Sequence, residues 1–300
     1  MNYITSHTGE FAALAVAIFW TVTALAFESA SRKVGSLTVN ILRLIMAFFF
    51  LGIYTLITNG HFLPLDASIH NWLWLGLSGI VGLVLGDYFL FRSYPLIGSR
   101  FAMLIMTLAP PLAAIFGYFI LGESLNLMQM TGMIIVIFGI SLAIFNKPVS
   151  GERLSIKISP AGLLFAFIGA IGQGLGIVLS KYGMEEYDAF ASTQIRIIAG
   201  IAGFSILITL LRRWGNVAAA LKNPPAMKAL TVGAIFGPFL GISFSLLAVR
   251  HTQAGIASTI MAIVPVLILA PSAWIYKEKI TAVEIAGAII SVAGVAFFFI

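Results

Sequence analysis

Residues 102–123 read AMLIMTLAPPLAAIFGYFILGE, and residues 257–278 read ASTIMAIVPVLILAPSAWIYKE. The two stretches lie 155 positions apart, and each has an alanine at its start, a proline inside an apolar run and a glutamate at its end. The same offset pairs Gly82 with Gly237, Gly86 with Gly241, Gly132 with Gly287 and Gly139 with Gly294. Nearer the start of the chain, an offset of 153 pairs Gly9 with Gly162, Ile18 with Ile171 and Arg43 with Arg196. This self-similarity indicates a tandem duplication of one structural unit.

The composition places the duplicated unit in a lipid bilayer. Of the 300 residues, 60% are hydrophobic and 9% are charged, whereas a soluble domain has about 25% charged residues on average. So few charges cannot give so much apolar chain a water-facing surface, which excludes a soluble enzyme. The absence of cysteine also excludes disulfides, thiol catalysis and metal sites built on thiolates.

A helix needs about 20 mostly apolar residues to cross the hydrocarbon layer, and the chain contains ten such runs. They cover residues 10–28, 36–58, 71–91, 98–121, 127–145, 160–181, 189–211, 227–249, 254–275 and 281–300. The first run has no basic region or small-residue cleavage site before it, so we expect a retained span rather than a signal peptide. The predicted fold is an all-α, polytopic membrane protein of ten transmembrane helices.

Each repeat has five spans, an odd number, so the second repeat must lie upside down in the membrane relative to the first. We expect a first five-helix repeat over residues 1–146, a cytoplasmic linker over 147–159 and an inverted second repeat over 160–300. Of the 17 basic residues, thirteen lie at odd-numbered connections, two lie at even-numbered connections, and Arg43 and Arg196 lie inside spans. Because lysine and arginine mark the cytoplasmic side, odd-numbered connections are predicted to be cytoplasmic and both termini to lie outside.

Three ionisable residues lie inside the predicted spans, where a charge needs a partner or a wet cavity. Arg43 and Asp87 lie at similar depths from the odd-numbered connections, so one hypothesis is an ion pair between them. Arg196 matches Arg43, but Ile242 stands in the second repeat where a match for Asp87 would be. Arg196 therefore has no inherited partner, and its guanidinium is predicted to bind an anionic group of a substrate. The alternative is that Arg196 reaches the acidic loop at residues 185–188 or bonds free backbone carbonyls.

Polar and aromatic residues at matching positions of the two repeats would face one axis and build a pocket at the membrane midplane. The predicted substrate-binding residues are Trp20, Thr21, Asn40, Arg43, Asp87, Tyr88, Gln173, Thr193, Gln194, Arg196 and Ser243. Prolines 110, 111, 265 and 271 interrupt the fourth and ninth spans, and we expect the kinked helices to line this cavity. Glycines spaced four residues apart are expected to let helices approach closely.

An enzyme inside the membrane is the rival class of protein. The four histidines lie in the terminal segment or in loops, without the spacing of metal ligands. Asp87 is the only carboxylate of the sequence that lies fully within a span, so an aspartyl dyad cannot be assembled. The sequence therefore predicts no catalytic residue, no metal and no cofactor.

The two proline stretches carry a family resemblance. Residues 108–123 and 263–279, each a proline followed 13 residues later by a glutamate, resemble a motif of the EamA-type members of the drug/metabolite transporter superfamily. The resemblance covers essentially the whole chain, although Lys277 stands where the family usually has glycine. It implies an inner-membrane secondary transporter, commonly an exporter of amino acids or other small metabolites. Related small multidrug exporters depend on a carboxylate embedded in the first span, where this chain has only Glu10 and Glu28 near the two ends.

The sequence thus predicts a secondary active transporter that exports small amphipathic metabolites, amino acids first, by alternating access around a central cavity. The expected partners are a small-molecule substrate and the lipid bilayer, and a proton or other coupling ion and a monomeric state are compatible with the sequence. No nucleic-acid partner is expected, because the net charge of +6 is explained by orientation. A proton-coupled antiporter of cationic drugs, a nucleotide-sugar or lipid-carrier translocator and a non-transport integral membrane subunit remain alternatives.

Overall fold

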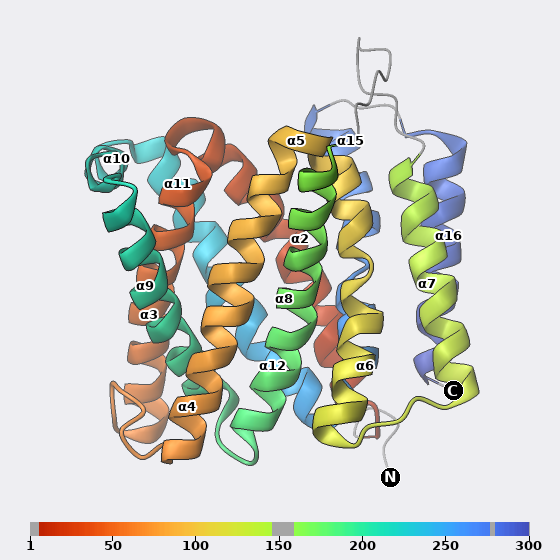
Figure 1. The fold of residues 1–300 in the computed structure, drawn as a ribbon, viewed down its shortest axis with the longest axis horizontal. Helices are drawn as coiled ribbons and strands as arrows, with labels where there is room; N and C mark the ends of the chain where they lie inside the picture. Colours follow the sequence, from red (N-terminus) through yellow and green to blue (C-terminus); the bar gives the residue numbers. More distant parts are fainter. Residues whose placement is uncertain (1–5, 146–158, 277–279, 300) are drawn as a thin grey trace.

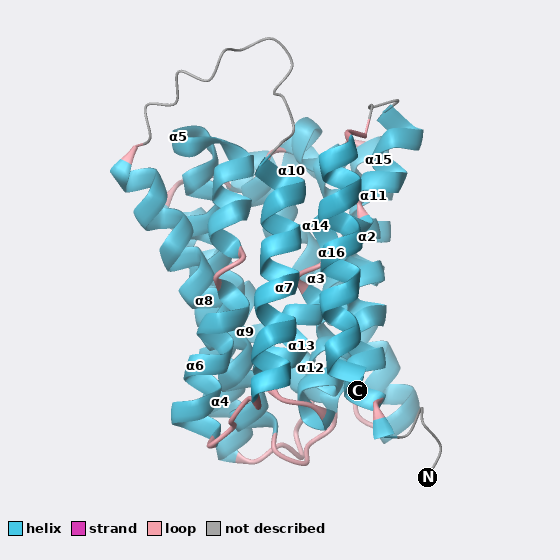
Figure 2. Ribbon diagram, turned by 90° about the vertical axis from the view of Figure 1, so that its right-hand side faces the viewer, coloured by secondary structure: helices cyan, strands magenta, loops and turns pink. Residues whose placement is uncertain are grey.

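The structure is a computed structural model that describes residues 6–145, 159–276 and 280–299. These described residues form helices and connections, without a strand (Figure 2). They contain ten helical segments that are long and apolar enough to cross a membrane, which confirms the predicted polytopic all-α fold. Residues 147–158 of the predicted linker, and the motif residues Lys277, Glu278 and Lys279, lie outside the described residues.

Each five-span repeat is built from a similar series of helices. The first repeat contains α2 (Thr8–Val34), α3 (Ser36–Asn59), α4 (Ile69–Ser78), the π-helix η1 (Gly79–Gly86), α5 (Asp87–Met106), α6 (Ala109–Leu121) and α7 (Leu127–Phe145). The second repeat contains α8 (Pro160–Met184), α9 (Ala189–Leu210), α10 (Trp214–Leu221), α11 (Pro224–Ala234), the π-helix η2 (Ile235–Gly241), α12 (Ile242–His251), α13 (Ala254–Met261), α14 (Val264–Leu267), α15 (Leu269–Tyr276), α16 (Ala282–Ala296) and the 3-10 helix η3 (Phe297–Phe299).

The two ends of the helical bundle carry different connections (Figure 1). The first turn of α2 and the last turn of α16 lie at one end, together with the even-numbered connections at residues 60–68, 122–126, 185–188 and 252–253, and we call it the termini end. The opposite end, which we call the odd end, carries α10 and the bend of α5 between the third and fourth spans. This bend differs from the sequence prediction, because α5 stays helical from Asp87 to Met106 where we expected a loop between residues 91 and 98.

Local sequence explains where several helices start and stop. Gly60 and Gly122 end α3 and α6 with φ angles of 79° and 68°, a left-handed conformation that glycine adopts without steric cost. Ser68 begins α4 with a capping box, and Asp188 caps α9 by accepting hydrogen bonds from two backbone amides of its first turn. These caps sit at the termini end, where the chain has to leave one span and enter the next.

The prolines of the two repeat stretches break their spans at matching places. In the fourth span α5 ends at Met106 and α6 begins at Ala109, followed at once by Pro110. In the ninth span α13 ends at Met261 and α14 begins at Val264, followed by Pro265. Proline lacks a backbone N–H and clashes with the preceding turn, so each span is divided near its middle.

The repeats are interlocked, because the first span of each packs against the third span of the other. On one side α8 lies against η1, and a β-carbon added to Gly172 or to Gly176 would lie 2.8 Å from the Cα atom of Gly86 or Gly82, respectively. On the other side α2 lies against η2, where Gly241 gives room to the indole of Trp20. The glycine spacing thus gives the close helix approach that the sequence predicted.

The fifth spans of the two repeats form a second close pair, α7 against α16. A β-carbon on Gly139 would lie 2.5 Å from the backbone nitrogen of Ser291, and one on Gly287 would lie 2.6 Å from the carbonyl oxygen of Gly139. The 155-residue offset relates Gly139 to Gly294 and Ser291 to Val136, and a β-carbon on Gly294 would lie 2.8 Å from the backbone nitrogen of Val136. The contact of Gly139 with Ser291 thus has its counterpart on the other helix, as an inverted repeat requires.

The glycine contact between α8 and η1 predicts a loss of stability on adding one methyl group. Gly172→Ala is expected to lower the thermal unfolding temperature of the purified protein, since overpacking a close contact costs about 1–3 kcal/mol. Gly76→Ala is the matched control, because a β-carbon at Gly76 in α4 meets nothing within 4 Å. The control should leave the unfolding temperature unchanged or raise it; equal temperatures for both variants would contradict the contact.

Candidate functional site

A cavity of about 380 Å³ lies between the two repeats. Residues from nine of the ten spans line it, from α2 through to α14. Five of the predicted site residues are among them: Trp20, Arg43, Asp87, Gln173 and Arg196. Both repeat prolines, Pro110 and Pro265, also line the cavity, as expected for kinked helices beside a binding space.

Arg43 of α3 and Asp87 of α5 form an ion pair, which confirms the predicted pairing. The second carboxylate oxygen of Asp87 accepts a hydrogen bond of 2.9 Å from the side-chain amide of Gln173 on α8. That amide also donates to the carbonyl oxygen of Gly82 in η1, at 3.2 Å. Since one oxygen of Asp87 faces Arg43 and the other faces Gln173, this carboxylate is already satisfied by protein groups.

Arg196 of α9 has no such partner. Its side chain lines the cavity, the residue is 5% exposed, and its Nε atom is buried without a hydrogen-bond acceptor. Among the described residues, no carboxylate forms an ion pair with it. A β-carbon at Gly82 would come within 3.5 Å of the Arg196 Nη2 atom, so the glycine leaves room for the guanidinium beside η1.

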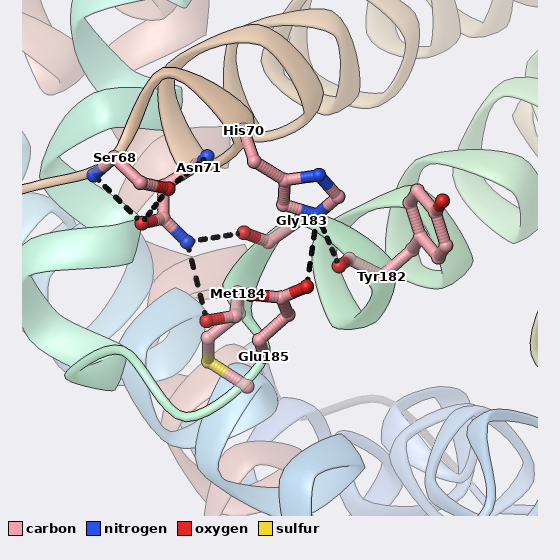
Figure 3. Close-up of polar contacts among 7 residues, drawn as sticks. All are labelled: Ser68, His70, Asn71, Tyr182, Gly183, Met184 and Glu185. Atoms are coloured by element: carbon pink, nitrogen blue, oxygen red, sulfur yellow. Dashed lines mark hydrogen bonds and ion pairs between the residues drawn. The ribbon is translucent and has the colours of Figure 1, made fainter.

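The alternative role for Arg196, reaching the acidic loop at residues 185–188, does not fit the structure. Glu185 faces the imidazole of His70 at 3.5 Å (Figure 3), and Glu186 pairs with Arg250. Asp188 accepts hydrogen bonds from the first turn of α9. Each acidic side chain of the loop therefore has a partner of its own.

The cavity has a positive balance of charge and mostly apolar walls. Among the described residues that line it, the charged ones are Arg43, Asp87 and Arg196, which sum to one positive charge. Three methionines contribute to the remaining wall: Met103, Met106 and Met261. Methionine side chains are flexible and polarisable and adapt to apolar groups of different shapes. The site can therefore hold a small molecule that joins one negative group to an apolar body.

Six of the predicted site residues lie outside the cavity lining: Thr21, Asn40, Tyr88, Thr193, Gln194 and Ser243. Thr21 and Tyr88 each follow a lining residue by one position, which turns a helical side chain by about 100°. Four of the six satisfy their polar groups locally, by donating to the carbonyl one turn earlier: Thr21, Asn40, Thr193 and Ser243. Gln194 instead donates to the carbonyl of Phe62 in a connection at the termini end.

Several lining residues were missed by the sequence analysis, although a helical signal for them exists. They follow identified positions by three or four residues, and examples are Thr23 and Ala24 after Trp20, Leu90 after Asp87, and Ile177 after Gln173. The same spacing links Ile242 to Ser245 and Ser258 to Met261 and Ala262. Continuing the helix faces that start at Trp20, Asp87 and Gln173 would have found the lining residues that follow these three.

Comparison with known proteins agrees with this architecture. The chain is 27% identical over 179 residues to an uncharacterized transporter of Clostridium kluyveri, a match that covers 60% of this chain and 56% of that protein. The match thus spans little more than half of that relative's length. A solved crystal structure of another protein is similar to this chain, with a TM-score of 0.73 and a sequence identity of 18%. That similarity covers 98% of this chain and 96% of the other, and it shows the fold alone.

The family comparison covers both repeats. The EamA-like transporter family matches residues 7–145 and again residues 160–300. The two matches fall on the two five-span repeats that the 155-residue offset and the interlocked helices define. The chain is a multi-pass membrane protein that belongs to the EamA-like transporter family.

Proposed function

We propose that the protein is a secondary active transporter that exports small amphipathic metabolites carrying a carboxylate, amino acids first, by alternating access around the central cavity. The observation that carries this proposal is Arg196, a buried cation that pairs with no carboxylate of the described residues and lines a cavity shared by the two inverted repeats. A cation held in a low-dielectric site is costly unless an anion completes it. A substrate carboxylate would supply that anion.

The geometry around Arg196 suits one carboxylate. A guanidinium presents parallel N–H donors that match the two oxygens of a carboxylate, and such bidentate hydrogen bonds are short and strong. The buried Nε–H of Arg196 is one donor without an acceptor. For an amino acid, the carboxylate would bind here, and the apolar side chain would contact Trp20 and the methionines of the wall.

The interlocked repeats support alternating access as the mechanism. In an inverted repeat, each half can adopt the conformation of the other, and exchanging the two conformations moves the opening from one membrane face to the opposite face. The cavity lies between the repeats, and the proline breaks in the fourth and ninth spans divide the helices that flank it.

We place the protein in the inner (plasma) membrane with the odd end in the cytoplasm and both termini outside. Arg212, Arg213 and Lys222 surround α10 at the odd end, where positive charge favours the cytoplasmic side. Because the chain has no cysteine, an Asn216→Cys variant in α10 and a His61→Cys variant at the termini end each carry a single thiol. The accessibility of that thiol reports the side of the membrane on which it lies. A membrane-impermeant maleimide should label the first variant from the cytoplasmic face and the second from the outer face. The reverse pattern would contradict this orientation.

Replacing Arg196 tests the carboxylate site. Arg196→Gln is expected to weaken substrate binding by about 10- to 100-fold, the range for losing one charge-assisted hydrogen bond. Arg196→Lys should bind substrate more tightly than Arg196→Gln and more weakly than the natural protein, because an ammonium keeps the charge but loses the bidentate hydrogen bonds. The measurement is the ligand-induced rise in unfolding temperature across a panel of amino acids, followed by transport in liposomes.

Arg250→Gln is the matched control for Arg196, since Arg250 pairs with a highly exposed glutamate away from the cavity. This variant should bind and transport like the natural protein. Unchanged binding and transport by Arg196→Gln would overturn the role of Arg196, and no ligand response from any amino acid would count against the proposed substrate class.

Asp87 separates this proposal from a proton-coupled antiporter of cationic drugs. An antiporter of that kind would lose proton-driven efflux of cationic dyes in Asp87→Asn. We expect instead that Asp87→Asn lowers stability by roughly 3–5 kcal/mol, because it leaves Arg43 unpaired in the cavity wall. The double variant Arg43→Leu with Asp87→Leu should recover most of that loss and still bind carboxylates. Dye efflux that depends on Asp87 would favour the antiporter.

A further inference from the structure

The connection between α12 and α13 is a tight turn held by two charged side chains. We propose that Glu123 and Lys181 grip the backbone of residues 252–254 and so form a gate that closes the cavity at the termini end. Releasing this grip is the step that lets the cavity open on that face. The proposal concerns the closed end of the cavity and does not depend on which substrate Arg196 binds.

We call the contacts of Glu123 and Lys181 with the backbone of residues 252–254 the grip. Glu123, just after the end of α6, lies 2.5 Å from the ammonium of Lys181 in the last turn of α8. Lys181 donates to the carbonyl oxygen of Thr252 at 2.7 Å, and Glu123 accepts from the backbone amide of Ala254 at 2.8 Å. Beside them, Gln253 donates to the carbonyl oxygen of Ser124 at 3.0 Å. The turn is therefore bound at three successive residues.

Residues 252–254 lie between the lining of the cavity and the termini end. Directly beneath these residues α13 packs against α6, and a β-carbon at Gly255 would lie 2.8 Å from the β-carbon of Ala114. The lining of the cavity begins further in, at Ser258, and extends along the fourth span to Met103 near the odd end. Beyond the proline break, α14 packs against α2, α7 and α16. The fourth and ninth spans thus meet at the termini end and leave the cavity between them further along.

The chemistry of the grip allows it to open and close. Glu123 and Lys181 are held by each other, and their side chains are 13% and 22% exposed. When the turn moves away, this ion pair stays intact, and water satisfies the freed backbone groups of Thr252 and Ala254. The Thr252 hydroxyl also donates to Glu10 at 2.6 Å, and the imidazole of His7 lies 3.8 Å from the other oxygen of that carboxyl group. Opening therefore breaks hydrogen bonds but no ion pair, and it avoids the large cost that breaking a buried ion pair would have. The hydrogen bonds that Lys181, Glu123, Ser124 and Glu10 make with residues 252–254 are exchanged for hydrogen bonds to water, so the net cost of opening is small enough for a reversible closure.

Cysteine accessibility tests the gate. In the cysteine-free chain, Ser258→Cys places a thiol in the cavity wall, and Ser245→Cys gives a second position. A membrane-impermeant maleimide is applied in turn to each face of membrane vesicles. With the gate residues unchanged, the maleimide should label each introduced cysteine rapidly from the odd end and slowly from the termini end. Equal labelling of the Ser258→Cys and Ser245→Cys variants from both faces would overturn closure at the termini end.

Two substitutions should open the gate by different routes. Lys181→Met removes the donor to Thr252, and Ala254→Pro removes the backbone N–H that Glu123 accepts. Ala254 is the first residue of α13, a position at which proline is compatible with a helix. Each variant should raise labelling from the termini end by about tenfold to a hundredfold, the range for one charge-assisted hydrogen bond. Retained labelling from the odd end shows that the variant is folded.

Glu186→Gln is the matched control, because the pair of Glu186 with Arg250 lies at the same end and Glu186 is 93% exposed. It should leave labelling unchanged. The exchange Glu123→Lys with Lys181→Glu restores an ion pair but places no acceptor at residue 123 for Ala254, so the gate should stay open. Slow labelling from the termini end in this exchange, or in both single variants, would overturn the proposal.

Discussion

The close approach of α8 to η1 is the contact on which the rest of the structure depends. Lipid gives apolar helices no reason to associate, so two spans of different repeats meet here through glycine backbones. That approach brings Gln173 of the second repeat within hydrogen-bonding distance of Asp87 in the first. It also leaves room beside Gly82 for the guanidinium of Arg196. With larger residues at these glycines, the polar residues of the two repeats would be held apart, and the cavity would lose its charged wall.

Much of this arrangement was predictable because it follows from periodicity. The apolar runs predict the ten spans, and the constant offset between similar residues predicts the duplication. The prolines at positions 110 and 265 predict the breaks in the fourth and ninth spans. The pair of Arg43 and Asp87 was predictable because both residues lie at one depth and charges in hydrocarbon need partners. The same reasoning identified Arg196 as the residue without a partner.

The details that the sequence did not reveal depend on helix rotation and on tertiary contacts. Polar residues such as Thr193 and Ser243 looked available for binding, but each bonds to the carbonyl of its own preceding turn. The π-helices η1 and η2 shift the helical register in the third span of each repeat. Neither glycine content nor hydropathy predicts that shift. The sequence identified Glu123 only as the glutamate at the end of a repeated stretch and of a family motif. Its contact with residue 254, 131 positions away, becomes visible only in the folded chain.

The unequal charges of the two repeats have a thermodynamic consequence. If the two inverted repeats were identical, a two-fold rotation in the membrane plane would relate the inward-open and outward-open states, and the two states would have equal free energy. Here Arg43 faces an aspartate, whereas Arg196 pairs with no carboxylate in the part of the chain that the structure describes, and Ile242 stands at the position that matches Asp87. Every such mismatch adds to the free-energy difference between the two states, and that difference sets their populations in the absence of ligand. The resting orientation of the empty protein is therefore encoded in the positions at which its two repeats have diverged.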